Sequence, residues 1–314
     1  MIDIVIVNWN AGKLLAEALA SVAAHHEGVV DAVVVVDNAS TDNSLELLEA
    51  QKEGLPFALR IVRNTENCGF GAACNQGAAL VHSEFILFLN PDTRLFAGSL
   101  SVPLAFMKAA QNQSVGICGI QLLDDRGKVS RSCARFPTPR LLYGWMLGLD
   151  KLLPRLFPSH LMQEWGHDTS RDVDQVIGAF FMVRGRLFHQ LNGFDERFFV
   201  YQEEVDFSLR AHRLGWRSHY LAEAKAYHKG GGSSGQVKAR RLFYSLRSRI
   251  LYGYKHFSRV QATAVLLSTL LLEPFARVTL SLLQSSFKSI GETLSAYLML
   301  YEELPVLISR VWKK

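Results

Sequence analysis

The sequence predicts an α/β fold in which helices flank a mostly parallel central sheet, followed by an α-helical C-terminal extension. Short, wholly apolar runs alternate with helical patterns in the first half of the chain, as expected of strands buried on both faces. Polar residues gather where these runs end, which is where open α/β sheets bind ligands. The composition later becomes basic and apolar, so we expect an α/β domain over residues 1–238 and a helical region over residues 239–314.

The predicted elements alternate along the chain as strand and crossover helix. Strands are expected at Ile4–Val7, Ala32–Val36, Leu59–Val62, Phe85–Leu89, Val115–Leu122, Val176–Val183 and Ala224–His228. Helices are expected around Leu14–Val22, Leu45–Leu48 and Ala72–Val81, and from Glu203 onward, where Phe207, Leu209 and Leu214 suit one helix face. Ser40, Thr41 and Asp42 are N-cap candidates for the second helix. Residues 135–155, rich in Pro, Leu and aromatic side chains, are expected to form an irregular excursion that is mobile or acceptor-facing, and residues 230–234 a flexible loop.

The composition limits the class of protein. A length of 314 residues suffices for one large domain and an appendage. With 49% apolar and 20% charged residues, the chain is neither disordered nor a polytopic membrane protein. Its four cysteines form no Cys-x-x-Cys pair, which indicates reduced thiols in a cytosolic compartment. The N-terminus lacks the basic start of a signal peptide and is interpreted as the first strand.

The formal charge of +5 is unevenly distributed along the chain. Eight Lys or Arg residues and no acid lie between Lys229 and Arg259, just before the apolar run Ala262–Leu272. The uncharged run ends at Glu273 and, at about 13 residues, is too short to cross roughly 30 Å of hydrocarbon as one helix. These features predict a segment that lies in a membrane interface. Packing on the α/β domain, or a homodimer contact, is the alternative.

Residues that could bind a nucleotide lie at the ends of the first two predicted strands. Asp37 follows four valines, so its carboxylate should emerge at the carboxyl edge of the sheet, beside the turn that contains Asn8 and Asn10. There it could accept hydrogen bonds from ribose hydroxyls or from a base N–H group. The alternative is that Asp37 or Asn38 ends the strand and caps the next helix.

A glycine-rich turn, Asn67-Cys68-Gly69-Phe70-Gly71, precedes the third predicted helix. Gly69 and Gly71 would let the backbone approach a diphosphate, and the N-terminus of the following helix favours negative charge. The spacing fits neither a P-loop nor a dinucleotide fingerprint. A plain structural turn therefore remains the alternative.

The segment Asn90-Pro91-Asp92-Thr93 follows the strand Phe85–Leu89 and presents an oxygen ligand where a diphosphate would lie. Magnesium and manganese favour such ligands and complete their shells with phosphate oxygens. His228, after the last predicted strand, could supply a second ligand. A lone histidine is more often a packed or surface residue, which is the alternative.

Three acids, Glu203, Glu204 and Asp206, begin the helix that contains Phe207. Acids in a first turn stabilise a helix through its dipole, which is a purely structural role. Adjacent carboxylates also raise each other's proton affinity, as a general base for a sugar hydroxyl requires. Both interpretations remain open on the residues alone.

Taken together, these segments resemble the family 2 glycosyltransferases, particularly the rhamnosyltransferase-like branch that builds bacterial surface polysaccharides. The resemblance covers roughly residues 2–235. Its five elements, in order, are Val7–Asn10, Val36–Asp42, Asn67–Gly71, Asn90–Asp92 and Phe199–Asp206. The resemblance implies the Rossmann-like GT-A fold of nucleotide-diphospho-sugar transferases, a nucleotide-sugar donor and inversion at the anomeric carbon.

The resemblance also implies a role for each candidate residue. Asp92, the last acid of an Asp-x-Asp-like motif, and His228 would hold one Mn²⁺ or Mg²⁺ ion. Glu204 would be the base, beside Glu203 and supported by Asp206. The donor would be bound around Asn8, Asn10, Asp37, Asn38, Asn67, Gly69, Gly71, Asn75 and Asn90. The sequence departs from the family pattern twice, because Asn90 replaces the first Asp of the motif and Glu204 is one methylene longer than the usual Asp.

The resemblance suggests dTDP-rhamnose as donor, with UDP-hexoses or galactofuranose as other options, and a lipid-linked or growing cell-wall polysaccharide as acceptor. We expect a cytoplasmic enzyme, peripherally associated with the inner face of the cell membrane, with no nucleic acid partner. The alternatives are a nucleotidyltransferase acting on sugar phosphates and a non-catalytic membrane-bound scaffold. A nucleotidyltransferase would normally carry a basic phosphate-binding loop near its N-terminus, where this chain has only Lys13.

Overall fold

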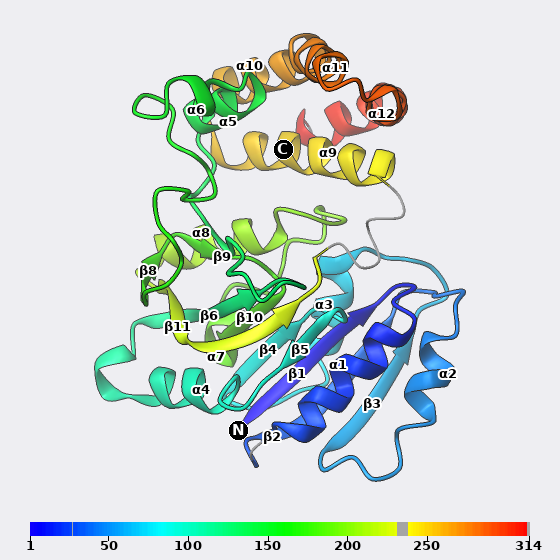
Figure 1. The fold of residues 1–314 in the computed structure, drawn as a ribbon, viewed down its shortest axis with the longest axis vertical. Coiled ribbons are helices and arrows are strands. Elements are labelled where there is room, and N and C mark those ends of the chain that lie inside the picture. The colour runs from blue at the N-terminus through cyan, green and yellow to red at the C-terminus, as the bar shows by residue number, and fades with distance from the viewer. Residues whose placement is uncertain (27, 231–237, 313–314) are drawn as a thin grey trace. The chain divides into compact units, whose positions relative to one another are not determined.

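The computed structural model describes residues 1–26, 28–230 and 238–312, which belong to two compact units (Figure 1). The first, the α/β unit, comprises Met1–Arg135, Gln163–Glu196 and Glu203–Ser233. The second, the helical unit, comprises Phe136–Met162, Arg197–Gln202 and Ser234–Lys314. A segment from the middle of the chain thus packs with the C-terminal helices.

The α/β unit is built on one sheet that has nine strands among the described residues. The strand order is β3-β2-β1-β4-β10-β6-β11-β5, with β8 also paired to β11. Strands β3, β2, β1 and β4 are parallel, as are β6 and β11, whereas β10, β5 and β8 run antiparallel to their neighbours. The predicted mostly parallel sheet is therefore confirmed.

The bounds of the strands follow the predicted apolar runs closely in the first half of the chain. The strands of the main sheet are β1 (Ile2–Asn8), β2 (Val30–Asp37), β3 (Ala58–Arg63), β4 (Phe85–Leu89), β5 (Thr93–Leu95), β6 (Val115–Leu123), β8 (Arg171–Val173), β10 (Phe180–Arg184) and β11 (Arg217–His228). A separate pair is formed by β7 (Cys133–Ala134) and β9 (Gln175–Val176).

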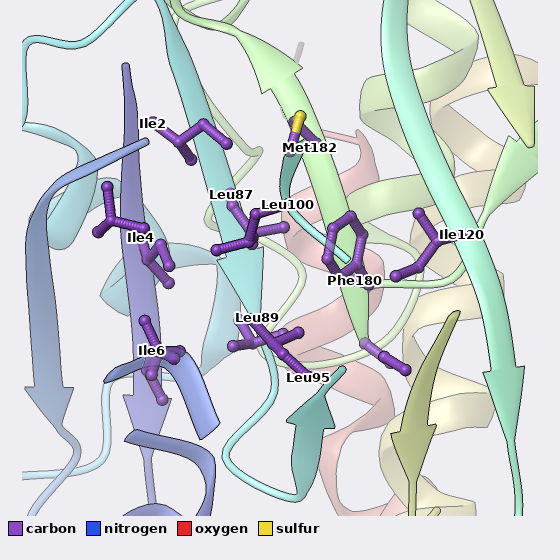
Figure 2. Packing of buried hydrophobic residues seen from close by; sticks show 14 of the residues in the cluster. Ile2, Ile4, Ile6, Leu87, Leu89, Leu95, Leu100, Ile120, Phe180 and Met182 are labelled. Carbon is purple, nitrogen blue, oxygen red and sulfur yellow. The ribbon is translucent and has the colours of Figure 1, made fainter. Parts of the chain in front are cut away.

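One face of the sheet packs against the helices α1 (Lys13–Ala24), α2 (Ser44–Glu49) and α4 (Ser101–Lys108). Successive residues of a strand point to opposite faces, so every second residue of β1 contributes to this core. Figure 2 shows Ile2, Ile4 and Ile6 of β1 beside Leu87 and Leu89 of β4. This fully buried layer fixes the carboxyl ends of both strands.

The opposite face packs against α3 (Phe70–Ala78), α7 (Gly185–Gln190) and α8 (Glu203–Arg213). Gly77 lets α3 approach the sheet closely, because an added Cβ there would lie 2.4 Å from Val5 Cγ1. An aromatic cluster joins α7 and α8 to the sheet. Its members are Phe88, Phe181, Phe188, Phe194 and Phe207.

Several predicted elements of the α/β unit differ from the structure. The single strand expected at Val176–Val183 is wrong, because β9 and β10 are separated by residues 177–179 and belong to different sheets. An unbroken apolar run carries no signal for such a break. Helix α3 begins two residues before and ends three residues before the predicted Ala72–Val81. Leu214, expected on the buried face of α8, is exposed beyond the end of that helix.

Within its described residues, the helical unit contains two short helices and four longer ones. They are α5 (Pro139–Met146), α6 (Leu149–Leu152), α9 (Lys238–His256), α10 (Arg259–Leu271), α11 (Glu273–Leu283) and α12 (Phe287–Trp312). The irregular excursion expected at residues 135–155 is wrong, because Thr138 caps α5 and Leu142 and Met146 pack against Val265 of α10. Most of the predicted loop at residues 230–234 lies outside the described residues.

Helices α10 and α11 follow each other almost without interruption. The stretch Arg259–Leu283 is long and apolar enough to cross a membrane by length and composition, and about a third of it is buried. The expectation that Glu273 ends the apolar segment is wrong. Glu273 is buried and accepts hydrogen bonds from Arg249 Nη1 at 2.5 Å and from Arg277 Nε at 2.8 Å. The acid therefore points into the helical unit and leaves the outer surface uncharged there.

Candidate active site

The carboxyl ends of β1 and β2 carry a buried hydrogen-bonded cluster. The strand register places Asn8 beside Asp37. Asn8 Nδ2 donates to Asp37 Oδ1 at 2.7 Å and to Ser44 Oγ at 2.8 Å, and the Ser40 amide donates to Asp37 Oδ2 at 3.1 Å. Asp37 thus holds the loop that follows β2 against β1, at the edge of the sheet where ligands bind in open α/β folds.

The turn after β1 is tied to the same loop. The Asn10 amide donates to Ser40 Oγ at 3.0 Å, and the Thr41 amide donates to Asn10 Oδ1 at 2.7 Å. Asn10 itself has a positive φ of 51°, a conformation that asparagine tolerates better than most residues. The predicted N-cap position at Ser40, Thr41 or Asp42 is wrong, although Asp42 Oδ1 accepts a hydrogen bond from the amide of Ser44, the first residue of α2, at 3.2 Å. Helix α2 has Asn43 at its N-cap, without a side-chain capping bond, so neither Asp37 nor Asn38 caps it.

The glycine-rich turn joins this cluster through Asn38. Asn38 Nδ2 donates to the Gly69 carbonyl at 3.1 Å, and the Gly69 amide donates to Asn67 Oδ1 at 2.9 Å. Gly69 has a φ of +90°, which favours glycine, and Gly71 is buried in the first turn of α3. The structure therefore brings Asn8, Asn10, Asp37, Asn38, Asn67, Gly69 and Gly71 into one neighbourhood.

Asn75, further along α3, has its amide engaged by the protein. Its Oδ1 accepts from the Phe194 amide at 2.9 Å, while its Nδ2 donates to the Phe194 carbonyl at 2.9 Å and to Glu196 Oε1 at 3.0 Å. These bonds fix the chain that leads from α7 towards α8. A contact of Asn75 with the donor stays a prediction.

Asp92 and His228 are brought together by strand pairing although they are far apart in the sequence. Strand β5 runs antiparallel to the end of β11, with Thr93 opposite His228. His228 Nε2 lies 3.3 Å from Asp92 Oδ1, and the Lys229 amide donates to the Asp92 carbonyl at 3.2 Å. The Asn90 amide donates to the Ala179 carbonyl at 3.1 Å and so anchors the turn before Asp92.

The chemistry of this pair fits a divalent cation. A carboxylate oxygen and an imidazole nitrogen are both ligands that manganese accepts. Two ligands at about 2.1 Å from a metal and at right angles to each other stand about 3 Å apart, close to the observed separation. No cluster of three or more His, Cys, Asp or Glu residues suited to a metal occurs in the part of the chain that the structure describes. The remaining ligands would have to come from the donor or from water.

The acidic pair at the start of α8 is removed from water. Glu203 is buried and Glu204 partly so, and the Oε2 atoms of both are buried without a hydrogen-bond partner among the described residues. Burial raises the pKa of Glu203 well above its ordinary value, and the neighbouring Glu204 carboxylate raises it further. Burial also raises the pKa of Glu204. A carboxylate with this affinity for protons suits a general base.

The backbone before this pair is strained. Tyr201 and Gln202 have φ values of 67° and 72°, in the left-handed region that bulky residues rarely adopt. Such conformations cost about 1–3 kcal/mol each and concentrate at functional sites. They fix the direction in which α8 begins, and with it the positions of Glu203 and Glu204.

The residue that orients Asp206 was missed from the sequence. Arg210 Nε donates to the fully buried Asp206 Oδ2 at 2.7 Å, and its other nitrogens donate to the carbonyls of Leu191 and Gly193. The signal for it was the i, i+4 spacing of an acid and an arginine on one helix. Asp206 therefore ties α8 to the end of α7, which supports the position of the acidic pair.

Comparison with known proteins identifies the family. The model of "Glycosyl transferase family 2" matches residues 3–147, and that of "Glycosyl transferase family group 2" matches residues 85–308, more than half of the chain. The chain belongs to glycosyltransferase family 2. Family 2 enzymes are inverting, and this family 2 glycosyltransferase acts on a nucleotide-sugar. The nucleotidyltransferase and scaffold alternatives are therefore set aside.

Two curated relatives of this family 2 enzyme are rhamnosyltransferases. The N-acetylglucosaminyl-diphospho-decaprenol L-rhamnosyltransferase of Mycobacterium tuberculosis is 28% identical over 269 residues, which cover 80% of this chain and 83% of that protein. Rhamnosyltransferase WbbL of Escherichia coli is 28% identical over 195 residues, covering 59% of this chain and 69% of that protein.

Solved structures confirm the GT-A fold of the enzyme. Mannosyltransferase PcManGT of Pyrobaculum calidifontis, in complex with GDP-Man and Mn²⁺, has a TM-score of 0.58 at 15% identity and covers 96% of this chain and 86% of that chain. TarS of S. aureus, in complex with UDP-GlcNAc, has a TM-score of 0.55 at 17% identity and covers 94% of this chain and 79% of that chain.

Proposed function

We propose that this family 2 enzyme transfers rhamnose from dTDP-rhamnose to a hydroxyl group of a lipid-linked or growing polysaccharide acceptor, at the cytoplasmic face of the cell membrane. The juxtaposition of Asp92 and His228 carries the catalytic part of the proposal, because a carboxylate and an imidazole 3.3 Å apart would suit a divalent cation at the edge of the sheet. The choice of sugar and acceptor is supported by the two relatives, both rhamnosyltransferases, one of which is named for a diphospho-decaprenol acceptor.

The proposed reaction is a single displacement. Glu204 accepts the proton of the acceptor hydroxyl while that oxygen forms a bond to the anomeric carbon. The bond from this carbon to the diphosphate breaks, and the nucleoside diphosphate leaves with the electron pair. Glu204 is favoured over Glu203 as the base because it is the more exposed of the two. Burial raises the proton affinity of Glu204, and Asp206 would hold the helix in place through Arg210.

The other residues bind and orient the donor. The Asn8–Asp37 cluster would receive the nucleoside, and the turn around Gly69 would approach its phosphates at the start of α3. A bound Mn²⁺ or Mg²⁺ ion, held by Asp92 and His228, would supply positive charge at the departing diphosphate. The leaving group then needs no proton donor, in contrast to the sugar leaving groups of glycosidases.

A donor panel tests the proposal. Release of nucleoside diphosphate would be measured with dTDP-rhamnose, UDP-glucose, UDP-N-acetylglucosamine and UDP-galactofuranose, with and without an N-acetylglucosaminyl-diphospho-polyprenol acceptor. We expect turnover with dTDP-rhamnose that requires the acceptor, stops with EDTA and returns with Mn²⁺. Equal turnover with a UDP-sugar would contradict the assignment of the sugar.

A matched pair of variants tests the metal site in the same assay. Asp92→Asn should lower kcat/KM by about 100-fold or more, because the charge that holds the cation is lost. Asp31→Asn, which removes an exposed acid at the start of β2, should leave kcat/KM unchanged. Full activity of Asp92→Asn in the presence of EDTA would remove the metal from the mechanism.

A further inference from the structure

Exposed large apolar side chains are concentrated in the helical unit. Of the 25 such side chains among the described residues, 20 belong to this unit, although it is the smaller of the two. Single exposed apolar residues are ordinary on any protein surface, but contiguous patches mark interaction sites. The arrangement of these residues along the helices shows that they form such a patch.

The outer face of α10 and α11 carries a continuous apolar stripe. Leu272, between the two helices, keeps helical dihedral angles (φ −101°, ψ −44°). The stripe follows the three- and four-residue spacing of one helix face across both helices. Its members are Val260, Ala264, Leu267, Leu271, Phe275, Val278 and Leu282. All are exposed or partly exposed, and none is charged.

A second stripe with the same spacing runs along α12. Its exposed apolar members are Phe287, Leu294, Leu298, Tyr301 and Ile308. The opposite face of α12 is buried, at Ala296, Tyr297, Leu300 and Leu307. Helices α10, α11 and α12 lie on one side of α9 (Figure 1), and both α10 and α12 contact α9. Their inner faces are thus covered within the unit, and their outer faces are not.

The charge of the helical unit identifies the kind of surface that these stripes fit. The unit contains 16 Lys and Arg residues against 5 Asp and Glu residues, a formal charge of +11. Exposed cations adjoin the apolar side chains, with Arg259 beside Val260 and Lys288 beside Phe287. Lys151 and Arg155 alternate in the same way with exposed leucines after α5. A surface that is both apolar and cationic is complementary to a bilayer of anionic lipid.

We propose that the outer faces of α10, α11 and α12 dock this enzyme onto an anionic bilayer, with the apolar stripes inserted to the headgroup–acyl boundary. The proposal deepens the proposed function, on which it rests for the identity of the membrane. The docked helices lie along the bilayer and do not cross it. Crossing would require Arg259–Leu283 to leave the contacts of its buried third and to carry Glu273 and its arginine partners into hydrocarbon.

Flotation with liposomes tests the docking surface. The full-length protein is mixed with vesicles of phosphatidylcholine alone or with 30% phosphatidylglycerol (about one lipid in three, to give a strong surface potential). We expect flotation with the anionic vesicles and much less with the neutral ones. Raising the salt concentration should weaken binding, because screening shortens the reach of the cationic residues. Release of the bound protein by alkaline carbonate would support a surface position, and resistance to it would overturn the claim that the helices do not cross.

Two matched leucines provide the decisive variants. Leu282 on the α11 stripe is 55% exposed, and Leu214 in the α/β unit is 52% exposed. Leu282→Glu, alone or with Phe275→Glu, should reduce partitioning onto anionic vesicles about tenfold or more, whereas Leu214→Glu should float like the natural protein. Because both leucines are exposed, neither change should alter the circular dichroism spectrum or the thermal melt.

Other outcomes would overturn the proposal. If Leu282→Glu with Phe275→Glu floats as well as the natural protein, these stripes are not the docking surface. If the natural protein is a dimer in solution that these substitutions dissociate, and it does not bind vesicles, the stripes contact a second copy. Turnover of dTDP-rhamnose with a detergent-solubilised acceptor, measured without vesicles, should be unchanged in these variants. Absence of that turnover in the natural protein would instead contradict the proposed function, so the two failures are distinguishable.

Discussion

The α/β unit contains 18 Lys and Arg residues against 24 Asp and Glu residues, whereas the helical unit contains 16 against 5. Their formal charges of −6 and +11 are thus opposite in sign. The α/β unit buries carboxylates at its candidate site, while the helical unit buries only a neutralised acid and exposes apolar side chains. An acidic unit that receives an anionic donor would require a bound cation, as we propose for Asp92 and His228. The helical unit contains nearly as many basic residues but few acids, so its net positive charge suits an anionic surface.

The largest effect is expected on kcat, from substitution in the acidic pair Glu203 and Glu204 of the α/β unit. Glu204→Gln removes the proposed base but keeps the size of the side chain, so we expect kcat to fall by about 10²–10⁴-fold. Binding of dTDP-rhamnose, measured by calorimetry, should be retained. As a control, Glu53→Gln changes an exposed acid of the same unit and should leave kcat unchanged. Full turnover of Glu204→Gln would exclude this residue as the base.

The second prediction concerns stability and compares an ion pair from each unit. Arg249 and Glu273 of the helical unit are 3% and 1% exposed, so Arg249→Ala leaves a buried carboxylate with one arginine partner fewer. We expect the free energy of unfolding, measured in urea, to fall by about 3–5 kcal/mol. The matched change Arg63→Ala breaks the exposed pair with Glu49 in the α/β unit and should cost about 0–1 kcal/mol. Equal losses would show that burial does not distinguish the two pairs.

The smallest expected effect is a pH-dependent gain in stability. The raised pKa of Glu203 means that the folded protein holds this proton more tightly than the unfolded chain, whose glutamate titrates near 4.5. The resulting stability is present below that pH and is lost as the pH rises through the folded-state pKa. Glu203→Gln cannot ionise, so it should melt a few degrees above the natural protein at pH 8. The difference should vanish near pH 4.

If Glu203→Gln and the natural protein melt at the same temperature at pH 8, burial of the Glu203 carboxylate does not destabilise the folded protein. Glu53→Gln again provides the control, because its carboxylate is exposed and should add no pH-dependent difference. A gain in stability with a loss of activity in Glu203→Gln would show that the α/β unit maintains this buried acid for function.

The apolar runs predicted the sheet well because strands that are buried on both faces must be apolar throughout. The same property hid the break between β9 and β10, since residues 177–179 continue the apolar pattern. Helix α5 was missed because a segment rich in Pro resembles irregular structure, although Pro139 occupies the first helical turn, where proline is tolerated. Glu273 appeared to end an apolar segment because a sequence does not show which way a side chain points.

The candidate site was predictable to a different extent in each of its parts. Asn8 and Asp37 end adjacent parallel strands, so their proximity follows from the predicted topology. The pairing of Asp92 with His228 depends on β5, a strand of three residues outside the predicted apolar runs. The sequence therefore suggested each residue as a ligand but did not show how they meet. The raised pKa of Glu203 depends on burial by residues distant in the sequence, which a first-turn acidic pattern does not reveal.

A bulge within β11 determines towards which face of the sheet the side chains at the end of this strand point. Leu221 pairs with Ile120 of β6 and Lys225 with the very next residue, Gln121, so residues 222–224 have no counterpart in β6. Because side chains alternate between the two faces of a strand, the number of residues in this bulge decides whether His228 or its neighbour turns towards Asp92. Inserting or deleting an even number of residues in this bulge would keep the His228 side chain on the same face. Inserting or deleting an odd number would turn it to the opposite face. The length of this bulge, more than its composition, therefore constrains how far the enzyme can be altered without separating His228 from Asp92.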